Sequence, residues 1–407
     1  MVCTSTPAGD GRWRRRHLAL PGARFGAIVE LVPGGHSSQR AHVGRDLDGE
    51  GVSTVGRFES AVAYRMMVRM RLSEEALVEA WADGLVSGEY HSGIGEEGIN
   101  AGVLLHLEDG DTMALDHRNT GPLVGRGVDL EGLMLEVLGS ETGMNHGRAG
   151  HMHLMARELG VASDGIVGAS APLAVGQALA HARSRTGSVA VAFHGEGAMN
   201  QGMLMEAYNL AVAWRLPVVF VCRDNRWSIT TRSRGVTGGT PTGRARSLGL
   251  AVEEAKGAEV GSVQAAAGRL IARARRGKGP GFLHATCHRP GGHFEGDPIV
   301  RVLRHPTQQA RALVPGLAAA SLRAGGGTLA DRGRGMFAVS ERVVLAVWDW
   351  AVRSGQDPVG RARRVLDAEV AAAIEQSERD EVRRAISAAR AAVGDRPVIG
   401  PGIGWSP

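Results

Sequence analysis

The sequence predicts an α/β protein with a parallel sheet and helices on both of its faces. Two short apolar runs, residues 189–193 and 218–222, have the length and composition of strands that are buried on both faces. Between these runs, apolar residues recur at spacings of three and four, which is typical of a helix with one apolar stripe. A strand, a helix and a strand in this order favour parallel strands joined by a right-handed crossover. The stripe consists of Met203, Leu204, Ala207, Leu210, Ala211 and Trp214.

Polar residues stand at the points where the two predicted strands end. Glu196 lies between Gly195 and Gly197 after the first strand, and Arg223 and Asn225 follow the second. Ligands of parallel sheets bind beyond the carboxyl ends of the strands, so these side chains should meet at one site. A carboxylate and an amide oxygen suit a Mg²⁺ ion that bridges to a diphosphate, and a guanidinium pairs well with phosphate. The sequence therefore predicts a site for Mg²⁺ and a diphosphate.

The same residues resemble the motif with which thiamine-diphosphate enzymes hold their metal and diphosphate. That motif is a Gly-Asp/Glu-Gly followed further along by Asn-Asn or Asp-Asn, and here the interval runs from Ala198 to Arg223. Residues 195–229 are similar, more specifically, to the alpha subunit of the decarboxylating component of 2-oxo acid dehydrogenase complexes. The resemblance implies the parallel-sheet thiamine-diphosphate-binding fold. It implies Mg²⁺ ligation by Glu196, Asn225 and the carbonyl of Trp227, and cofactor contacts by Gly195, Gly197, Ala198 and Arg223.

Two segments nearer the amino terminus resemble the same family. One carries the pair His117 and Arg118 where the family has Tyr-Arg, and the resemblance implies that this pair reaches the diphosphate. The other begins with Gly-Ile-Val-Gly at residues 165–168 and leads into an apolar helix. There, Gly165 is implied to contact the aminopyrimidine ring, and Val167 to be the wedge that bends the cofactor. Glycine permits close approach and a β-branched side chain is stiff, which fits both roles.

A segment at residues 289–298 resembles the stretch that holds the family's active-site histidine. Its Gly-His-Phe-Glu-Gly-Asp-Pro ending is closer to the acetoin-type enzymes. His293 falls on that histidine, so the resemblance implies that it hydrogen-bonds the diphosphate and that it steadies the substrate adduct or hands a lipoyl group its proton. Phe294 stands where regulated animal enzymes carry a phosphorylated serine, so that regulatory switch is not expected here.

A glycine-rich stretch with His146, His151 and His153 follows a glutamate in a run that is also similar to the family. These histidines could bind a transition metal, since imidazole is a common ligand of such ions. A loop that folds over the cofactor accounts for them better.

Helices are predicted at the beginning of the family-like region. An apolar pattern from Phe58 predicts one helix, and Ser73 is predicted to cap a second helix that runs through Leu85. The Gly-Glu-Glu-Gly at residues 95–98 then stands where the family has Gly-Gln-Glu-Ala, at a turn that opens a helix.

Composition excludes several classes of protein. Apolar residues make up 43% and charged residues 22% of the chain, as in a soluble globular protein, and no apolar run approaches the length of a membrane span. The three cysteines are isolated, which argues against disulfides and zinc clusters and for a reducing, cytoplasmic location. The net charge of +5 comes from scattered arginines and aromatic residues are only 4%, so nucleic-acid binding is not expected.

The chain divides into four predicted regions. Residues 1–55 read as a disordered extension, for which a targeting segment or a wrongly chosen start codon are alternatives. Residues 56–300 form the cofactor-binding domain, 301–356 an insertion without a family counterpart, and 357–407 the carboxyl-terminal helices and tail.

The resemblance implies an alpha subunit that is active only with a beta subunit. In the family a beta-subunit glutamate activates the cofactor, and the region after residue 300 is too short and irregular to supply it. We therefore expect an α₂β₂ heterotetramer that cleaves a 2-oxo acid or acetoin and passes the acyl group to a lipoyl acyltransferase. One alternative is a cofactor-binding regulatory paralogue with weak catalysis. Another is a nicotinamide dehydrogenase, but no GxGxxG follows a first strand convincingly.

Overall fold

The structure is a computed structural model that describes residues 54–229, 231–297 and 354–394, together with scattered positions between 311 and 337. The predicted amino-terminal extension and the predicted insertion lie largely outside the described residues. Within the part that is described, no helix combines the length and the apolar character that a membrane span needs.

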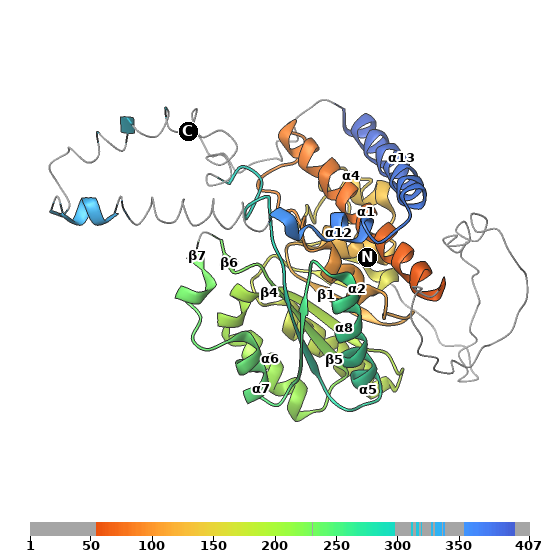
Figure 1. The fold of residues 1–407 in the computed structure, drawn as a ribbon, viewed down its shortest axis with the longest axis vertical. Coiled ribbons are helices and arrows are strands. Elements are labelled where there is room, and N and C mark those ends of the chain that lie inside the picture. The colour runs from red at the N-terminus through yellow and green to blue at the C-terminus, as the bar shows by residue number, and fades with distance from the viewer. Residues whose placement is uncertain are drawn as a thin grey trace, which may run out of the picture. The chain divides into compact units, whose positions relative to one another are not determined.

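A seven-stranded sheet forms the centre of the molecule, in the order β2-β3-β1-β4-β5-β9-β8 (Figure 1). All neighbouring pairs are parallel except β2 and β3, which are antiparallel. This confirms the predicted α/β class with a mainly parallel sheet. The strands are β1 (Thr112–Leu115), β2 (Met155–Ala156), β3 (Val161–Ser163), β4 (Ala190–Gly195), β5 (Val218–Asp224), β8 (Ala251–Lys256) and β9 (Gly281–Thr286).

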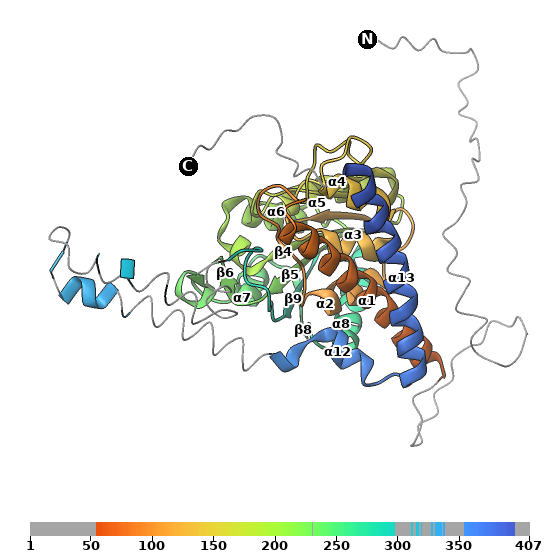
Figure 2. The same ribbon diagram turned by 90° about the horizontal axis from the view of Figure 1, so that it is seen from above.

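Helices cover both faces of this sheet (Figures 1 and 2). Alternate residues of β4 show why: Ala190 and Ala192 pack into one apolar cluster, and Val191 and Phe193 pack into the other. The first cluster includes α5 (Ser170–Ser184), α6 (Gly202–Ala213) and α7 (Pro241–Ser247). The second includes α1 (Thr54–Ala82), α2 (Glu97–Leu104), α3 (Thr120–Arg126), α4 (Leu130–Val137), α8 (Val260–Arg275), α12 (Pro358–Arg363) and α13 (Ala368–Val393).

Short elements complete the described residues. A two-stranded ribbon of β6 (Trp227–Ser228) and β7 (Thr231–Arg232) is separate from the main sheet. The single turns of 3₁₀ helix are η2 (Arg157–Leu159), η3 (Glu196–Asn200), η4 (Ser233–Gly235) and η5 (Ser354–Gln356).

The predicted strand, helix and strand are β4, α6 and β5, and the two strands are parallel as expected. The predicted apolar stripe of α6 is wrong at two positions, because Leu210 is 37% and Trp214 54% exposed. The helix turns only one narrow side toward the sheet, and Tyr208, which the stripe left out, is fully buried there against Phe220.

The first helix is longer than predicted, since α1 runs unbroken from Thr54 to Ala82. The predicted new helix at Ser73 is wrong. A serine caps a helix only where the backbone before it leaves the helical conformation, and Ser73 is a buried interior residue of α1. The helix ends instead before Gly84, whose φ of +77° suits glycine, and so does not reach Leu85.

Helices were predicted in the carboxyl-terminal region, and the long helix α13 found there packs beside α1. Its Val382 and Ala389 are buried in the core. A buried carboxylate strengthens this contact: Glu378 of α13 lies 3.3 Å from Nε of Arg65 and 2.6 Å from Nε of Arg69. The ion cluster ties the last helix of the described chain to the first.

Candidate functional site

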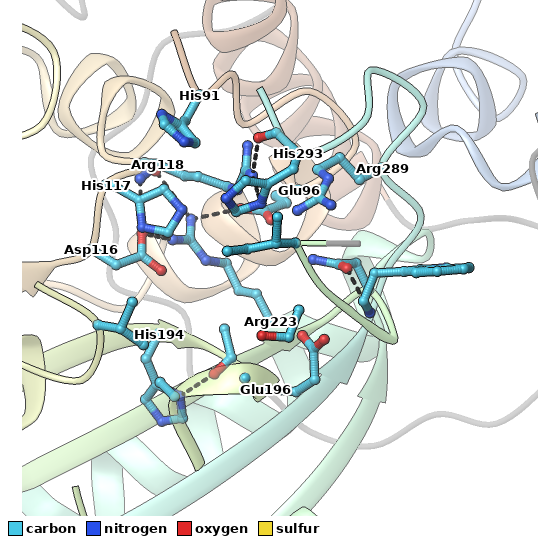
Figure 3. A pocket seen from close by; sticks show the side chains of 18 of the residues that line it. His91, Glu96, Asp116, His117, Arg118, His194, Glu196, Arg223, Arg289 and His293 are labelled. Carbon is cyan, nitrogen blue, oxygen red and sulfur yellow. Dashed lines mark hydrogen bonds and ion pairs between the residues drawn. The ribbon is translucent and has the colours of Figure 1, made fainter. Parts of the chain in front are cut away.

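A pocket lies where β4 and β5 end, at the carboxyl edge of the sheet (Figure 3). The register explains its position, because Gly195 pairs with Arg223 and the residues that follow each leave the sheet side by side. Every residue that the family resemblance implies for cofactor, metal or catalysis lines this pocket. They are His117, Arg118, Gly165, Val167, Gly195, Glu196, Gly197, Ala198, Arg223, Asn225, Trp227 and His293.

Glu196 stands at the end of β4 with only 3% of its surface exposed. Its carboxylate accepts a hydrogen bond from Ser233 Oγ at 2.6 Å. Burial, reinforced by the negative charge of Asp224, raises the pKa of Glu196 to about 7. The ionised form of a carboxylate in such surroundings is strongly stabilised by a cation placed beside it.

The turn after Glu196 depends on a glycine. A Cβ on Gly197 would lie 2.6 Å from the hydroxyl of Ser228, on the ribbon formed by β6 and β7. Only glycine lets the two segments approach this closely, so the backbone at Glu196 stays next to that ribbon.

Asn225 and Trp227 form a tight turn after β5. The Asn225 side-chain oxygen accepts a hydrogen bond from the backbone N–H of Trp227 at 3.0 Å. Arg226 between them has a φ of +69°, which bends the chain sharply. The turn fixes the amide oxygen at the same pocket as Glu196. A carboxylate, an amide oxygen and a backbone carbonyl are hard oxygen ligands, so the residues present fit Mg²⁺.

Arg118 is buried against the pocket wall, and its guanidinium contacts three acceptor atoms of two residues, Ser92 and His293. Its Nη1 donates to the carbonyl of Ser92, and its Nη2 donates to the carbonyl of His293. The same Nη2 lies 3.3 Å from His293 Nδ1. Since a guanidinium can only donate, His293 Nδ1 accepts this bond, and the proton of the neutral ring sits on Nε2.

Arg223 has different partners from those predicted. The sequence assigned its guanidinium to a phosphate, but the side chain is 1% exposed and pairs with Glu96 at 2.9 Å and with Asp116. Burial alone would raise the pKa of Asp116, but the charge of Arg223 lowers it well below its usual range. A guanidinium on a buried strand needs carboxylates near it, and the sequence does not reveal which carboxylates the fold brings there.

Sequence reasoning missed Arg289, which lines the same pocket. Its Nε has no hydrogen-bond partner among the described residues. Desolvation, followed by the charge of Arg118, lowers the pKa of Arg289 to about 9. A cationic group without a fixed partner at that atom suits an anionic ligand. Its place four residues before His293, inside a recognised segment, was the available signal.

Histidine rings form one wall of the pocket. The ring centroid of His91 lies 4.9 Å from that of His117 and 5.0 Å from that of His293. His91 Nδ1 and His151 Nε2 are hydrogen-bonded at 3.1 Å. Burial lowers the pKa of His117 to about 4 and that of His293 to about 3, so both rings are neutral at pH 7. His91 was not predicted as a site residue.

The three histidines that the sequence offered as a metal site do not come together in the described part of the chain. His151 is buried against His91, whereas the side chain of His153 is 54% exposed and lies near Asp164. His146 has a φ of +62° in an exposed turn. Although only one residue separates His151 from His153, their rings therefore do not face a common site.

Val167 lines the pocket while 46% of its surface remains exposed. Its sequence neighbour Ile166 is 61% exposed, and Ile229, which also lines the pocket, is 55% exposed. Apolar side chains at the edge of a pocket are available to a bound ligand or to a second chain.

A buried glutamate supports the segment that carries His91. Glu74 of α1 accepts hydrogen bonds from Tyr90 Oη at 2.6 Å and from the backbone N–H of Gly93 at 3.1 Å. Burial raises the pKa of Glu74 to about 7. The folded protein thus holds a proton that the unfolded chain releases near the usual value of 4.5. The stability from this group is present at low pH and is lost as the pH rises through about 7.

We expect Glu74→Gln to be more stable than the wild type at pH 8.5, by about 1–3 kcal/mol, and to gain little at pH 5. Glutamine keeps one oxygen that can accept from the Gly93 N–H, its NH₂ group can donate to Tyr90 Oη, and it carries no charge to bury. Urea unfolding at the two pH values measures the difference, with Glu79→Gln on the exposed side of α1 as the control. Equal destabilisation at both pH values would contradict the assignment.

Comparisons with known proteins identify the family of this chain. Residues 64–314 match the family described as the dehydrogenase E1 component. The alpha subunit of acetoin:2,6-dichlorophenolindophenol oxidoreductase from Cupriavidus necator is 39% identical over 236 residues, which are 58% of this chain and 71% of that one. The Bacillus subtilis protein of the same name is 37% identical over the same shares.

A third relative carries a different name. The pyruvate dehydrogenase E1 component subunit alpha of Rhizobium meliloti is 31% identical over 270 residues, which are 66% of this chain and 78% of that one. Among solved structures, the transketolase of Campylobacter jejuni gives a TM-score of 0.44 at 17% identity, over 56% of this chain and 37% of that one.

Proposed function

The chain belongs to the dehydrogenase E1 component family, and we propose that it is the alpha subunit of a thiamine-diphosphate-dependent 2-oxo acid or acetoin dehydrogenase. The observation that carries the proposal is the pocket in which Glu196 and Asn225 meet at neighbouring strand ends beside Arg118 and Arg289. Its relatives are named as subunits of catalytic components, which does not favour the regulatory alternative.

The proposed cofactor site has a cation-binding end and an anion-binding wall. Glu196, Asn225 and the carbonyl of Trp227 would hold Mg²⁺. Arg118 and Arg289 would neutralise the diphosphate, with the buried charge of Arg223 behind them. When bound, thiamine diphosphate supplies a nucleophilic carbon and an electron sink for the bond that is cleaved.

His293 is the residue we assign to proton chemistry. Arg118 holds its Nδ1 as an acceptor, so the ring presents Nε2–H as a donor. A neutral imidazole in this tautomer can hydrogen-bond a developing oxyanion or deliver a proton to it. His91, in ring contact with His293, limits how that ring can turn.

A beta subunit is implied by the names of the relatives, which are alpha subunits. We propose an α₂β₂ assembly in which the beta subunit completes the cofactor site and a lipoyl acyltransferase receives the acyl group. The exposed apolar side chains of Val167 and Ile229, which line the pocket, and of Ile166 next to Val167 in the sequence support a covering partner. A cytoplasmic location stays a prediction; the described cysteines, Cys222 and Cys287, are buried and unpaired.

Calorimetry tests the cofactor assignment. The full chain, with its beta subunit where the two co-purify, should bind thiamine diphosphate only when Mg²⁺ is present and should not bind NAD. Tight binding of NAD without thiamine diphosphate would favour the nicotinamide alternative. Turnover of pyruvate or acetoin with the beta subunit separates a catalytic chain from a regulatory paralogue. Full turnover by the chain alone would overturn the partner assignment.

A further inference from the structure

Three histidines in the pocket hold their ring nitrogens close enough to share one ion (Figure 3). The ligand atoms of His91, His117 and His293 all lie within 4.8 Å of one another. The three residues come from separate segments: one precedes α2, one follows β1 and one follows β9. Their convergence is therefore a product of the tertiary fold rather than of spacing along a single helix or strand.

We propose that His91, His117 and His293 form a binding site for a divalent transition-metal ion such as Zn²⁺. Imidazole nitrogen suits Zn²⁺, Co²⁺ and Ni²⁺, whereas Mg²⁺ prefers hard oxygen ligands. The histidine site and the oxygen site at Glu196 and Asn225 therefore select different ions. Three protein ligands leave a fourth position of a tetrahedral ion open to water or to a ligand in the pocket.

The pocket lining as a whole carries no excess of positive charge, although Arg118 is close enough to lower the pKa of all three rings. The pocket is lined by as many carboxylates as guanidinium groups, so these charges balance when all are ionised. Burial lowers the pKa of each of the three rings, so no ring has to lose a proton at neutral pH before it can bind an ion. The charged lining residues are Glu96, Asp116, Arg118, Glu196, Arg223 and Arg289.

Arg118 does not block the site. Its contact with His293 Nδ1, at 3.3 Å, is the longest of its three side-chain hydrogen bonds. If the ion takes that nitrogen, Arg118 keeps its bonds to the carbonyls of Ser92 and His293. Where two of the nitrogens stand further apart than a tetrahedral ion with bonds of about 2.0–2.1 Å allows, a small ring rotation brings them together.

Binding of a metal ion at the three histidines should affect activity in a way that can be distinguished from the proposed reaction. An ion at the three histidines would occupy His293, the group we assign to proton chemistry. An ion bound there should therefore inhibit the enzyme. This inhibition is separate from any competition of transition-metal ions with Mg²⁺ at the oxygen site.

Cobalt absorption tests the site directly and does not require turnover. The full chain in excess Mg²⁺ is titrated with Co²⁺, which should produce a visible tetrahedral band that saturates at one equivalent and disappears when Zn²⁺ is added. His117→Gln should weaken Co²⁺ binding at least about tenfold. His181→Gln, on α5 where its ring contacts Thr112 at the start of β1 and outside the pocket lining, is the matched control and should leave the band unchanged.

Two further variants make the result decisive. Glu196→Gln should keep the Co²⁺ band, which shows that the ion is not at the oxygen site and that this inference stands or falls separately from the cofactor assignment. His91→Gln should lose it, and serves in place of His117→Gln if circular dichroism shows that variant unfolded. Absence of a Co²⁺ band in the wild type, or a full band in folded His117→Gln or His91→Gln, would overturn the proposal.

Discussion

Replacement of Glu196 by glutamine is expected to weaken Mg²⁺-dependent binding of thiamine diphosphate by more than about 100-fold, and turnover with it. The change removes the only carboxylate among the three proposed Mg²⁺ ligands while it keeps the size of the side chain. Calorimetric titration of the cofactor at saturating Mg²⁺ measures the loss. Glu206→Gln, on the exposed side of α6, is the matched control and should bind normally.

Stability distinguishes this loss from unfolding. Burial raises the pKa of Glu196 to about 7, so its contribution to the stability of the metal-free protein is lost as the pH rises through that value. Glutamine has no charge to bury, so the variant should be at least as stable as the metal-free wild type at pH 8. Normal cofactor affinity in Glu196→Gln would show that the metal is held elsewhere.

Substitution of His293 by alanine is expected to lower kcat by about 10²–10⁴-fold with little change in cofactor affinity. The ring presents the proton on Nε2, and alanine removes that donor. The backbone carbonyl that anchors Arg118 is retained, so the diphosphate wall stays in place. Steady-state kinetics and calorimetry on one preparation separate the two effects, with His181→Ala as the control.

The pH profile adds an independent check on His293. Burial, followed by the charges of Arg118 and Arg289, lowers its pKa to about 3. Activity between pH 5 and pH 8 should therefore show no inflection from this ring. A loss of cofactor binding in His293→Ala, or a wild-type inflection near pH 6 that the variant lacks, would contradict its assigned state.

The sequence was most informative where local pattern and chemistry coincide. The runs that became β4 and β5 are apolar throughout, which only a strand covered on both faces requires, and the polar residues directly after them had to meet at one edge. Register then placed Glu196 and Asn225 in one pocket. The site residues outside these two strand ends, such as His117, Arg118 and His293, were predicted from the resemblance to the family rather than from local pattern.

Pairings between distant segments were beyond the sequence. Arg223 has the chemistry of a phosphate ligand, and only the fold reveals that Glu96 and Asp116 already surround it. His91 is a pocket residue because Glu74 accepts hydrogen bonds from Tyr90 and Gly93 on either side of it and so holds its segment in place. Such contacts depend on packing, which carries no periodic signal along the chain.

Helix ends were the least predictable local feature. Ser73 has the side chain of a capping residue, but the backbone around it continues as a helix and buries it. The exposure of Leu210 and Trp214 was likewise hidden, since spacing alone does not tell how wide a side of α6 the sheet covers.

The continuity of α1 makes the carboxyl-terminal helix relevant to catalysis at a distance. Arg69 of α1 pairs with Glu378 of α13, and Glu74 of α1 supports the loop that bears His91. These two residues of α1 are little more than one helical turn apart on the same unbroken helix. A truncation or a charge reversal in α13 would weaken the packing of α1 without changing any residue of the pocket. Screens for variants with altered thiamine-diphosphate affinity should therefore recover changes in α13 as well as in the pocket.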